Sequence, residues 1–334
     1  MVLKGNHRLQ ILIFYIIGVI TGVSFLFSYF SWQDLKKEER QHSDKRLFAQ
    51  EFISPLLECS DSSDSLLQQK FNEVKSSLKT LLPANIKANI YFKDLQTGAS
   101  FEWGDSTPLV AGSLSKVPLV MSYYKRLEEE PDLFQKKILF DQKEMLDLYD
   151  VQSIKPSQVL NLGQEYTIEQ LANVTITKSD NVAAAMLEQY DNHQGQKRIA
   201  LDLNIPIRKG VPPLRPIQIR DYASFFSILF NATYLNRKNS NEVLHLLSQT
   251  EYKDGLFAGV PATVKVAHKF GEALDGETKT TYFLNDCGVI YYPERPYVLC
   301  ISLNTEHKEL KTGLFIKEIS ALFYKKIDDI QSDK

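Results

Sequence analysis

The chain has 334 residues, is 43% hydrophobic and carries a formal net charge of −2, with six histidines and three cysteines. This length and apolar content allow a sizeable core in one large domain or two ordinary ones. The near-neutral charge argues against a nucleic-acid groove, and the sequence shows neither the Cys/His spacing of a zinc site nor a glycine-rich phosphate loop. We therefore expect no cofactor, no metal and no nucleic-acid partner.

A long apolar segment lies near the N-terminus. No charged side chain occurs in the 25 residues between Arg8 and Asp34, and a helix of that length crosses a hydrocarbon core of about 30 Å. The run ends in bulky residues rather than a small-x-small cleavage site, which favours an uncleaved anchor; a buried helix of a soluble domain is the alternative. Lys4 and Arg8 precede it without an acid, which predicts cytoplasmic residues 1–8, a single transmembrane helix at 9–33 and an extracytoplasmic body.

The first elements after this segment are a charged stretch, a helix and a hairpin. Residues 34–52 mix both signs of charge with few apolar side chains, as in a juxtamembrane stalk, so we place the folded domain at 53–330. Apolar residues recur at helical spacing over 64–82, which predicts an amphipathic helix. Alternating residues at 87–105, interrupted by DLQTG, predict a β-hairpin.

The rest of the chain divides into a helical block and a strand-rich end. Helices are predicted at 111–127, 167–176, 181–190, 218–231 and 240–248. Strands are predicted at 264–273, 281–293 and 296–304, and a closing helix at 311–327. These elements predict an α+β fold, in which terminal helices flank an antiparallel five-stranded sheet and an all-helical lobe is inserted. The crevice between sheet and lobe is the default site.

The three cysteines leave their pairing open. Cys59, Cys287 and Cys300 allow one disulfide with a spare thiol, or no disulfide. Cys287 and Cys300 lie on strands predicted to be neighbours, but spacing alone does not decide connectivity.

A serine and a lysine lie one turn apart at the start of the predicted helix 111–127. Unpaired backbone N–H groups and the positive end of the helix dipole surround Ser113. Lys116, three residues later, lies on the same face, so its amine can reach the hydroxyl and accept its proton if the amine is neutral. Ser-x-x-Lys also occurs at Ser76 and Ser122, and an isolated match is usually a helix cap or a solvated face.

Two further elements follow in order along the chain. Ser179, Asp180 and Asn181 stand between two predicted helices, where a plain N-cap is the simpler interpretation. The stretch HKFGE at 268–272 ends a predicted strand, where exposed lysines and glycines are common. His268 is interpreted as a packing or hydrogen-bonding residue.

Taken in order, the three elements resemble those of the class A β-lactamases and the related penicillin-binding proteins, namely Ser-x-x-Lys, Ser-Asp-Asn and Lys-Thr-Gly. The resemblance covers roughly residues 53–330 and includes the hairpin before the serine, the three late strands and the closing helix. It implies a β-lactamase-like fold and acyl transfer through a serine ester.

The resemblance also implies roles for individual residues. Ser113 would be the acylated nucleophile and Lys116 its proton acceptor. Ser179 would relay a proton to the leaving nitrogen, Asp180 would fix the turn by accepting backbone hydrogen bonds, and Asn181 would hold a substrate amide.

The late strand would supply the opposite wall of the site. Lys269 would add positive potential, and Gly271 would leave room for substrate along the strand edge. The backbone N–H groups of Ser113 and Glu272 would form the oxyanion hole. Phe270 replaces the family's threonine, which puts recognition of a substrate carboxylate in doubt. A strict Lys-Thr-Gly at 311–313 is a decoy, since only 21 residues follow it.

A second departure concerns hydrolysis of the ester. Class A β-lactamases carry a loop glutamate some 35 residues after Ser-Asp-Asn, whereas the corresponding stretch 203–222 contains no glutamate and has Asp221 only at a helix start. Glu188 lies too close to Asn181 in sequence to be a confident substitute. Slow deacylation, as in a penicillin-binding protein, is therefore expected.

These observations leave two hypotheses. The first is a membrane-anchored extracytoplasmic serine hydrolase, β-lactamase-like or D-alanyl-D-alanine peptidase-like, that acts on β-lactams or on a peptidoglycan-type peptide amide of the cell wall. The alternative is a non-catalytic cell-envelope binding module that retains the cleft. Nothing in the sequence indicates an oligomeric state.

Overall fold

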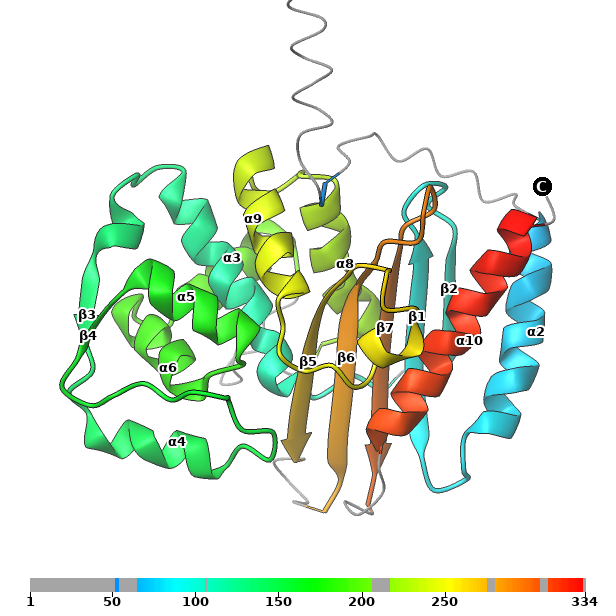
Figure 1. The fold of residues 1–334 in the computed structure, drawn as a ribbon, viewed down its shortest axis with the longest axis horizontal. Coiled ribbons are helices and arrows are strands. Elements are labelled where there is room, and N and C mark those ends of the chain that lie inside the picture. The colour runs from blue at the N-terminus through cyan, green and yellow to red at the C-terminus, as the bar shows by residue number, and fades with distance from the viewer. Residues whose placement is uncertain are drawn as a thin grey trace, which may run out of the picture. The chain divides into compact units, whose positions relative to one another are not determined.

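The computed structural model of the protein describes residues 52–53, 65–105, 107–205, 217–274, 280–306 and 312–332. An antiparallel five-stranded sheet packs beside a block of helices within the unit Phe52–Lys334 (Figure 1). The predicted α+β fold with an antiparallel sheet is confirmed. The predicted transmembrane helix at 9–33 lies outside the described residues, and within those residues no helix combines the length and apolar character needed to cross a membrane.

The sheet joins the two ends of the domain. Its strands are β1 (Lys87–Asp94), β2 (Ser100–Gly104), β5 (Val266–Leu274), β6 (Tyr282–Ile290) and β7 (Tyr297–Thr305). They lie in the order β2-β1-β7-β6-β5, with every neighbouring pair antiparallel. The predicted hairpin forms β1 and β2, and β7 lies between β1 and β6. This order leaves β5 at the edge that faces the helical block (Figure 1).

The two helices from the ends of the domain cover one face of the sheet. They are α2 (Ser65–Leu81) and α10 (Thr312–Ser332), side by side in Figure 1. Phe92 of β1 packs between them, with its ring centroid 5.2 Å from that of Phe71 and 5.5 Å from that of Phe323. Helix α8 (Ile219–Phe230) covers the other face. Both predicted terminal helices are present, and α10 continues five residues beyond the predicted end.

The helical block contains the other predicted helices and several elements that periodicity did not indicate. The predicted ones are α3 (Lys116–Leu127), α5 (Ile168–Thr177), α6 (Asn181–Tyr190) and α9 (Arg237–Ser248). Helix α9 begins three residues early, because the Asn236 side chain accepts a hydrogen bond from Asn239 N and caps it. The additional elements are α4 (Asp147–Asp150), α7 (Gly195–Asp202) and the pair β3 (Lys137–Leu139) and β4 (Glu165–Thr167).

Two of the cysteines meet in the sheet. Cys287 of β6 and Cys300 of β7 lie directly opposite each other and form a disulfide. Both are fully buried. The sequence left open whether one disulfide forms or none, and the structure shows one, between Cys287 and Cys300. Cys59 lies outside the described residues.

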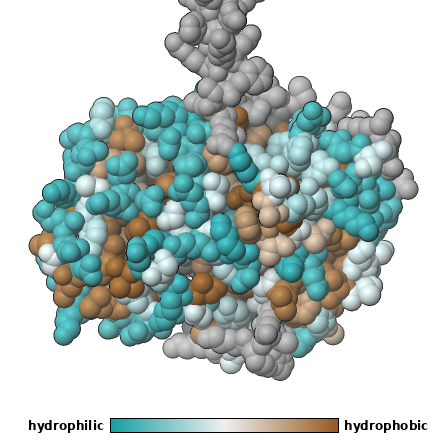
Figure 2. Space-filling model, viewed as in Figure 1, coloured by the Kyte–Doolittle hydropathy of each residue, from teal (hydrophilic) through white to brown (hydrophobic). Residues whose placement is uncertain are grey.

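The face of the domain that Figure 2 shows is mainly polar. Hydrophilic residues cover most of the face shown in Figure 2, with apolar residues gathered chiefly in the lower part of the helical block. The chain segment that connects β3 to β4 exposes several large apolar side chains, among them Val151, Val159 and Leu162.

Candidate active site

The serine of the first motif lies on a tight turn before α3. Residues Gly112–Ser115 form a 3-10 turn, η1, so the α-helix itself begins at Lys116 rather than near Ser113. Ser115 Oγ donates to Gly112 O at 2.8 Å and closes the turn. Ser113 remains partly exposed and lies at the surface of a cavity.

Two glycines allow this turn to approach the edge strand β5. Gly112 has φ +52°, and a Cβ there would lie 2.2 Å from Glu272 O. A Cβ on Gly271 would lie 2.6 Å from Ala111 O and 2.8 Å from Leu114 N. Gly271 therefore makes room for the backbone of the serine turn; its predicted role along the substrate remains a prediction.

Lys116 connects the first two motifs. Its Nζ lies 3.1 Å from Ser113 Oγ, 3.2 Å from Ser179 Oγ and 2.7 Å from Asn181 Oδ1, although Ser179 and Asn181 are more than 60 residues away in sequence. It also donates to Ser179 O at 2.5 Å. The side chain is buried, so the amine is held among these oxygens and away from bulk water. This geometry lets Lys116 exchange a proton with either serine.

Lys269 approaches Ser179 from the strand side. Its Nζ donates to Ser179 Oγ at 2.8 Å and to Phe270 O at 2.7 Å, and the residue is completely buried. Burial lowers the pKa of Lys269 well below its usual value, and the nearby Lys116 cation lowers it further, against the opposing attraction of Asp286 and Glu272. The predicted site thus gathers two lysines around one serine hydroxyl.

The Ser-Asp-Asn turn is held in an unusual backbone conformation. Ser179 has a backbone φ of +56°, a value that residues other than glycine and asparagine rarely adopt. Asp180 caps α6 by accepting from Ala183 N at 2.8 Å and also accepts from Tyr149 OH at 2.9 Å. Burial nevertheless raises the pKa of Asp180. Asn181 Nδ2 donates to Leu148 O at 3.2 Å, which orients its Oδ1 towards Lys116.

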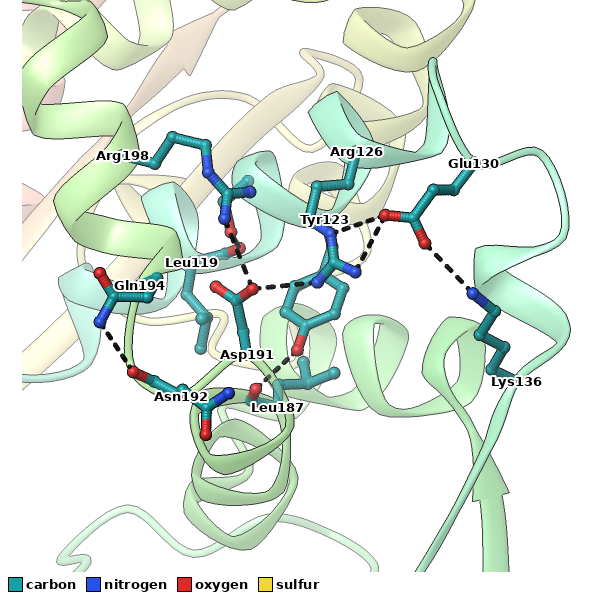
Figure 3. Close-up of polar contacts among 11 residues, drawn as sticks. Leu119, Tyr123, Arg126, Glu130, Lys136, Leu187, Asp191, Asn192, Gln194 and Arg198 are labelled. Atoms are coloured by element: carbon teal, nitrogen blue, oxygen red, sulfur yellow. Dashed lines mark hydrogen bonds and ion pairs between the residues drawn. The ribbon is translucent and has the colours of Figure 1, made fainter.

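A polar network behind the cavity fixes α3 against α6 (Figure 3). Tyr123 OH of α3 donates to Leu187 O of α6 at 2.6 Å. Arg126, also on α3, pairs with Asp191 at 3.0 Å, and Arg198 of α7 approaches the same carboxylate at 3.6 Å. The helices that carry Lys116 and Asn181 are therefore tied together at their far ends.

Phe270 does not enter the cavity. It is buried, its ring centroid lies 4.3 Å from that of Tyr252, and Lys269 Nζ lies 4.0 Å from the ring centroid. The neighbouring His268 donates its Nδ1–H to Asp286 Oδ1, 2.8 Å away, inside the sheet. Phe270 thus supplies packing at the position where the resemblance places a threonine hydroxyl.

The Glu272 side chain has a position that its predicted backbone role did not indicate. Its Oε1 accepts from Ser153 N at 2.7 Å and Ile154 N at 3.0 Å, and its Oε2 accepts from Tyr282 OH at 3.1 Å. Gln152, in the same loop, donates to Ser179 O at 3.0 Å. The loop after α4 is therefore bound both to β5 and to the Ser-Asp-Asn turn.

The hydrogen bonds that join the Glu272 side chain to Ser153 and Ile154 are called the Glu272 bridge, and cavities lie on both sides of it. One, of about 330 Å³, is lined by residues of η1, α3, α4 and the loop after it, α6 and β5: Gly112, Ser113, Ser115, Lys116, Leu148, Val151, Gln152, Asn181, Ala184, Ala185, Glu188 and Glu272. The other, of about 450 Å³, is lined by Ser153 and Ile154 together with Tyr252, Tyr282 and the start of α10. The Glu272 bridge stands between the two.

The remaining expectations from the sequence concern residues outside the serine cavity. Asp221 is in the first turn of α8 and, among the described residues, does not line the serine cavity, and 206–216 of the expected loop lie outside the described residues. Thr312 and Gly313 of the decoy motif begin α10. The described part of the chain contains no group of three side chains suited to a metal ion.

Comparisons with known proteins concern the family and the fold of the chain. A family model described as the beta-lactamase enzyme family matches residues 72–327. A mutant of PBP-A, solved as an acyl-enzyme complex with penicillin G, has a TM-score of 0.64 and 19% identity over 79% of this chain and 97% of its own. A class A beta-lactamase from Mycobacterium abscessus has a TM-score of 0.65 and 19% identity over 76% of this chain and 99% of its own. A search of curated proteins gives no match.

Proposed function

Because the chain belongs to the beta-lactamase enzyme family, we propose that it is a membrane-anchored extracytoplasmic serine hydrolase that forms an acyl-enzyme on Ser113. Its substrates are β-lactams or a peptidoglycan-type peptide amide, and its acyl-enzyme is released slowly. The observation that carries the proposal is the contact of Ser113 Oγ with Lys116 Nζ at 3.1 Å, beside a second serine hydroxyl.

The acylation step uses the groups around that contact. Neutral Lys116 takes the proton from Ser113 Oγ, which attacks the carbonyl carbon, while the backbone N–H groups of Ser113 and Glu272 stabilise the oxyanion. The carbon–nitrogen bond then breaks, and Ser179 Oγ gives its proton to the leaving nitrogen. Lys116, 3.2 Å from Ser179 Oγ, returns the proton that it took and becomes neutral again. The products are an ester on Ser113 and a free amine.

The proposed substrate classes follow from the family, and the site bears on how such a substrate would be recognised and released. The PBP-A structure was solved with penicillin G as an acyl-enzyme, although at 19% identity it supports the fold alone. Phe270 packs inside the domain and offers no hydroxyl for a substrate carboxylate, which separates this site from the usual family pattern. The absence of a glutamate between 203 and 222 supports slow release of the acyl group.

A non-catalytic binding module remains the second candidate. The hydrogen bonds from Ser153 N and Ile154 N to Glu272 favour it, because they hold the loop after α4 against the strand that forms one wall of the serine cavity. Such a module would retain affinity for the ligand without forming an ester.

Labelling with a fluorescent penicillin distinguishes the two functions. The full chain is expressed, membranes are isolated, and the labelled band is followed by gel and intact mass. We expect a Ser113-dependent adduct that sediments with membranes and is released by detergent. Ser113→Ala should abolish it, whereas Ser76→Ala, in a second Ser-x-x-Lys on α2, should not. Reversible binding without an adduct would establish the binding module, and a labelled band in the soluble fraction would contradict the anchor.

A further inference from the structure

The face of α6 that lines the serine cavity ends in a carboxylate. The cavity-lining residues of this helix are Asn181, Ala184, Ala185 and Glu188. Their spacing of three, four and seven residues places them on one face of the helix. Asn181 contacts Lys116 at one end of this face, and Glu188 lies two turns further along.

The two alanines leave the space between Glu188 and the serine turn open. Two helical turns correspond to about 10 Å of rise, but a helical side chain leans back towards the N-terminus and covers the preceding turn. Between Glu188 and Asn181 on this face, Ala184 and Ala185 offer only methyl groups, so no larger side chain of the cavity-lining face separates the two. Glu188 and Ser113 line one continuous cavity of about 330 Å³, large enough to hold water between them.

Gln196 holds the Glu188 carboxylate next to the serine turn. Its Nε2 donates to Glu188 Oε1 at 3.1 Å and to Ser115 O at 3.2 Å, so one amide nitrogen connects the carboxylate with the backbone two residues after Ser113. Gln196 is itself buried, and the adjoining Gly195 lies against α3, where a Cβ would come within 2.4 Å of Ser122 Oγ. The carboxylate is therefore placed by fixed elements.

The carboxylate keeps access to water. About a third of the Glu188 side chain is exposed. Its Oε2 lies 3.9 Å from His193 Nδ1, beyond hydrogen-bond distance, so this oxygen can accept from a water molecule. The other carboxylate that lines the cavity in the described chain is Glu272, and both of its oxygens already accept hydrogen bonds from Ser153, Ile154 and Tyr282.

Building on the proposed function, we infer that Glu188 is the proton acceptor for the water that hydrolyses the Ser113 ester. The water oxygen attacks the ester carbonyl carbon as one of its protons passes to Glu188. The bond from the carbonyl carbon to Ser113 Oγ then breaks. The proton held by Glu188 passes through water in the cavity to Lys116, which hands a proton on to Ser113 Oγ and is neutral again. Glu188 and Lys116 thus return to their starting states, and the products are a carboxylic acid and the free serine. The carboxylate acts from α6 rather than from the loop at 203–222, and the slow release proposed above is the rate with this base in place, which its removal would slow further.

Comparing acylation and deacylation of the full chain in detergent tests this assignment. Glu188→Gln keeps the shape of the side chain but cannot accept the proton. A positioned general base contributes about 100- to 10,000-fold, so we expect the penicilloyl adduct of Glu188→Gln to live at least about 100-fold longer. The rate of adduct formation should stay within about threefold of the wild-type rate. Glu318→Gln, on the exposed surface of α10, is the matched control and should change neither rate.

The outcomes separate this inference from the function on which it rests. Normal formation of the adduct with an unchanged lifetime in Glu188→Gln would overturn the role of Glu188 and leave the acyl-enzyme intact. No Ser113 adduct in the wild-type protein would instead overturn the proposed function itself. Should Glu188→Gln fail to fold, Glu188→Asp decides, because it withdraws the carboxylate by one methylene. We expect at least a tenfold longer lifetime for this variant, and an unchanged one would refute the assignment.

Discussion

Replacing Glu272 by methionine should release the loop after α4, which this carboxylate holds beside the serine cavity. The change removes the acceptors for Ser153 N, Ile154 N and Tyr282 OH, while the backbone N–H of residue 272, the predicted oxyanion donor, remains. Hydrogen bonds to a charged group are worth about 1.5–3 kcal/mol each when buried. Because Ser153 is exposed and Glu272 is partly exposed, we expect about 1–3 kcal/mol in total, or a 5- to 150-fold increase in loop opening.

Amide hydrogen exchange measures this opening directly. Protection of Ser153 and Ile154 should fall by the same factor in Glu272→Met, and by less than about tenfold in Glu272→Gln, which keeps a carbonyl acceptor. Opening should also join the two cavities and speed acylation by bulky β-lactams more than by small ones. Wild-type exchange at both amides in Glu272→Met would refute the idea that this carboxylate holds the loop.

Two further predictions concern stability. Arg295 Nε and Asp94 Oδ2 lie 2.6 Å apart in a fully buried ion pair, so Arg295→Met leaves the Asp94 carboxylate in the core without its cation. We expect the free energy of unfolding to fall by about 3–5 kcal/mol, which a lower Tm would show. The double variant with Asp94→Asn should recover part of this loss. The pKa of Lys269 is lowered by burial and by the Lys116 cation, so the unfolded chain binds a proton that the folded chain releases. The free energy of unfolding should therefore rise with pH from that lowered pKa to about 10.5, and urea titrations of Lys269→Met should lack this rise.

The sequence predicts the elements that local periodicity can specify. Alternation over 87–105 and the three late apolar segments predict the five strands of the sheet, and apolar residues at helical spacing predict the principal helices. Helix α7 was missed because GQKRIALD begins with glycine and contains few apolar residues. Strands β3 and β4 were missed because each has three residues and the chain between them is long, so their pairing leaves no local signal.

The site was predictable where its residues lie within one motif, and less so where distant segments meet. The pairs Ser113 with Lys116 and Asp180 with Asn181 are readable from spacing. The contacts of Glu272 with Ser153 and Ile154 join residues more than 110 positions apart, so only the fold reveals them. Glu188 lies close to Asn181 in sequence, and the spacing of seven residues already indicates that both lie on one helix face.

The contacts of Ser179 explain why a turn with a positive φ carries this hydroxyl. Its Oγ accepts hydrogen bonds from Lys269 Nζ at 2.8 Å and from Lys116 Nζ at 3.2 Å. A serine hydroxyl has two acceptor positions and one proton to donate. When both amines donate, the serine proton is directed away from them, and in the proposed reaction it points towards the leaving nitrogen. The left-handed backbone of Ser179 brings the oxygen between the two lysines while its carbonyl accepts from Gln152. In the proposed reaction the strain therefore serves to aim a proton at the leaving nitrogen, which a serine in an ordinary helix cap would not do.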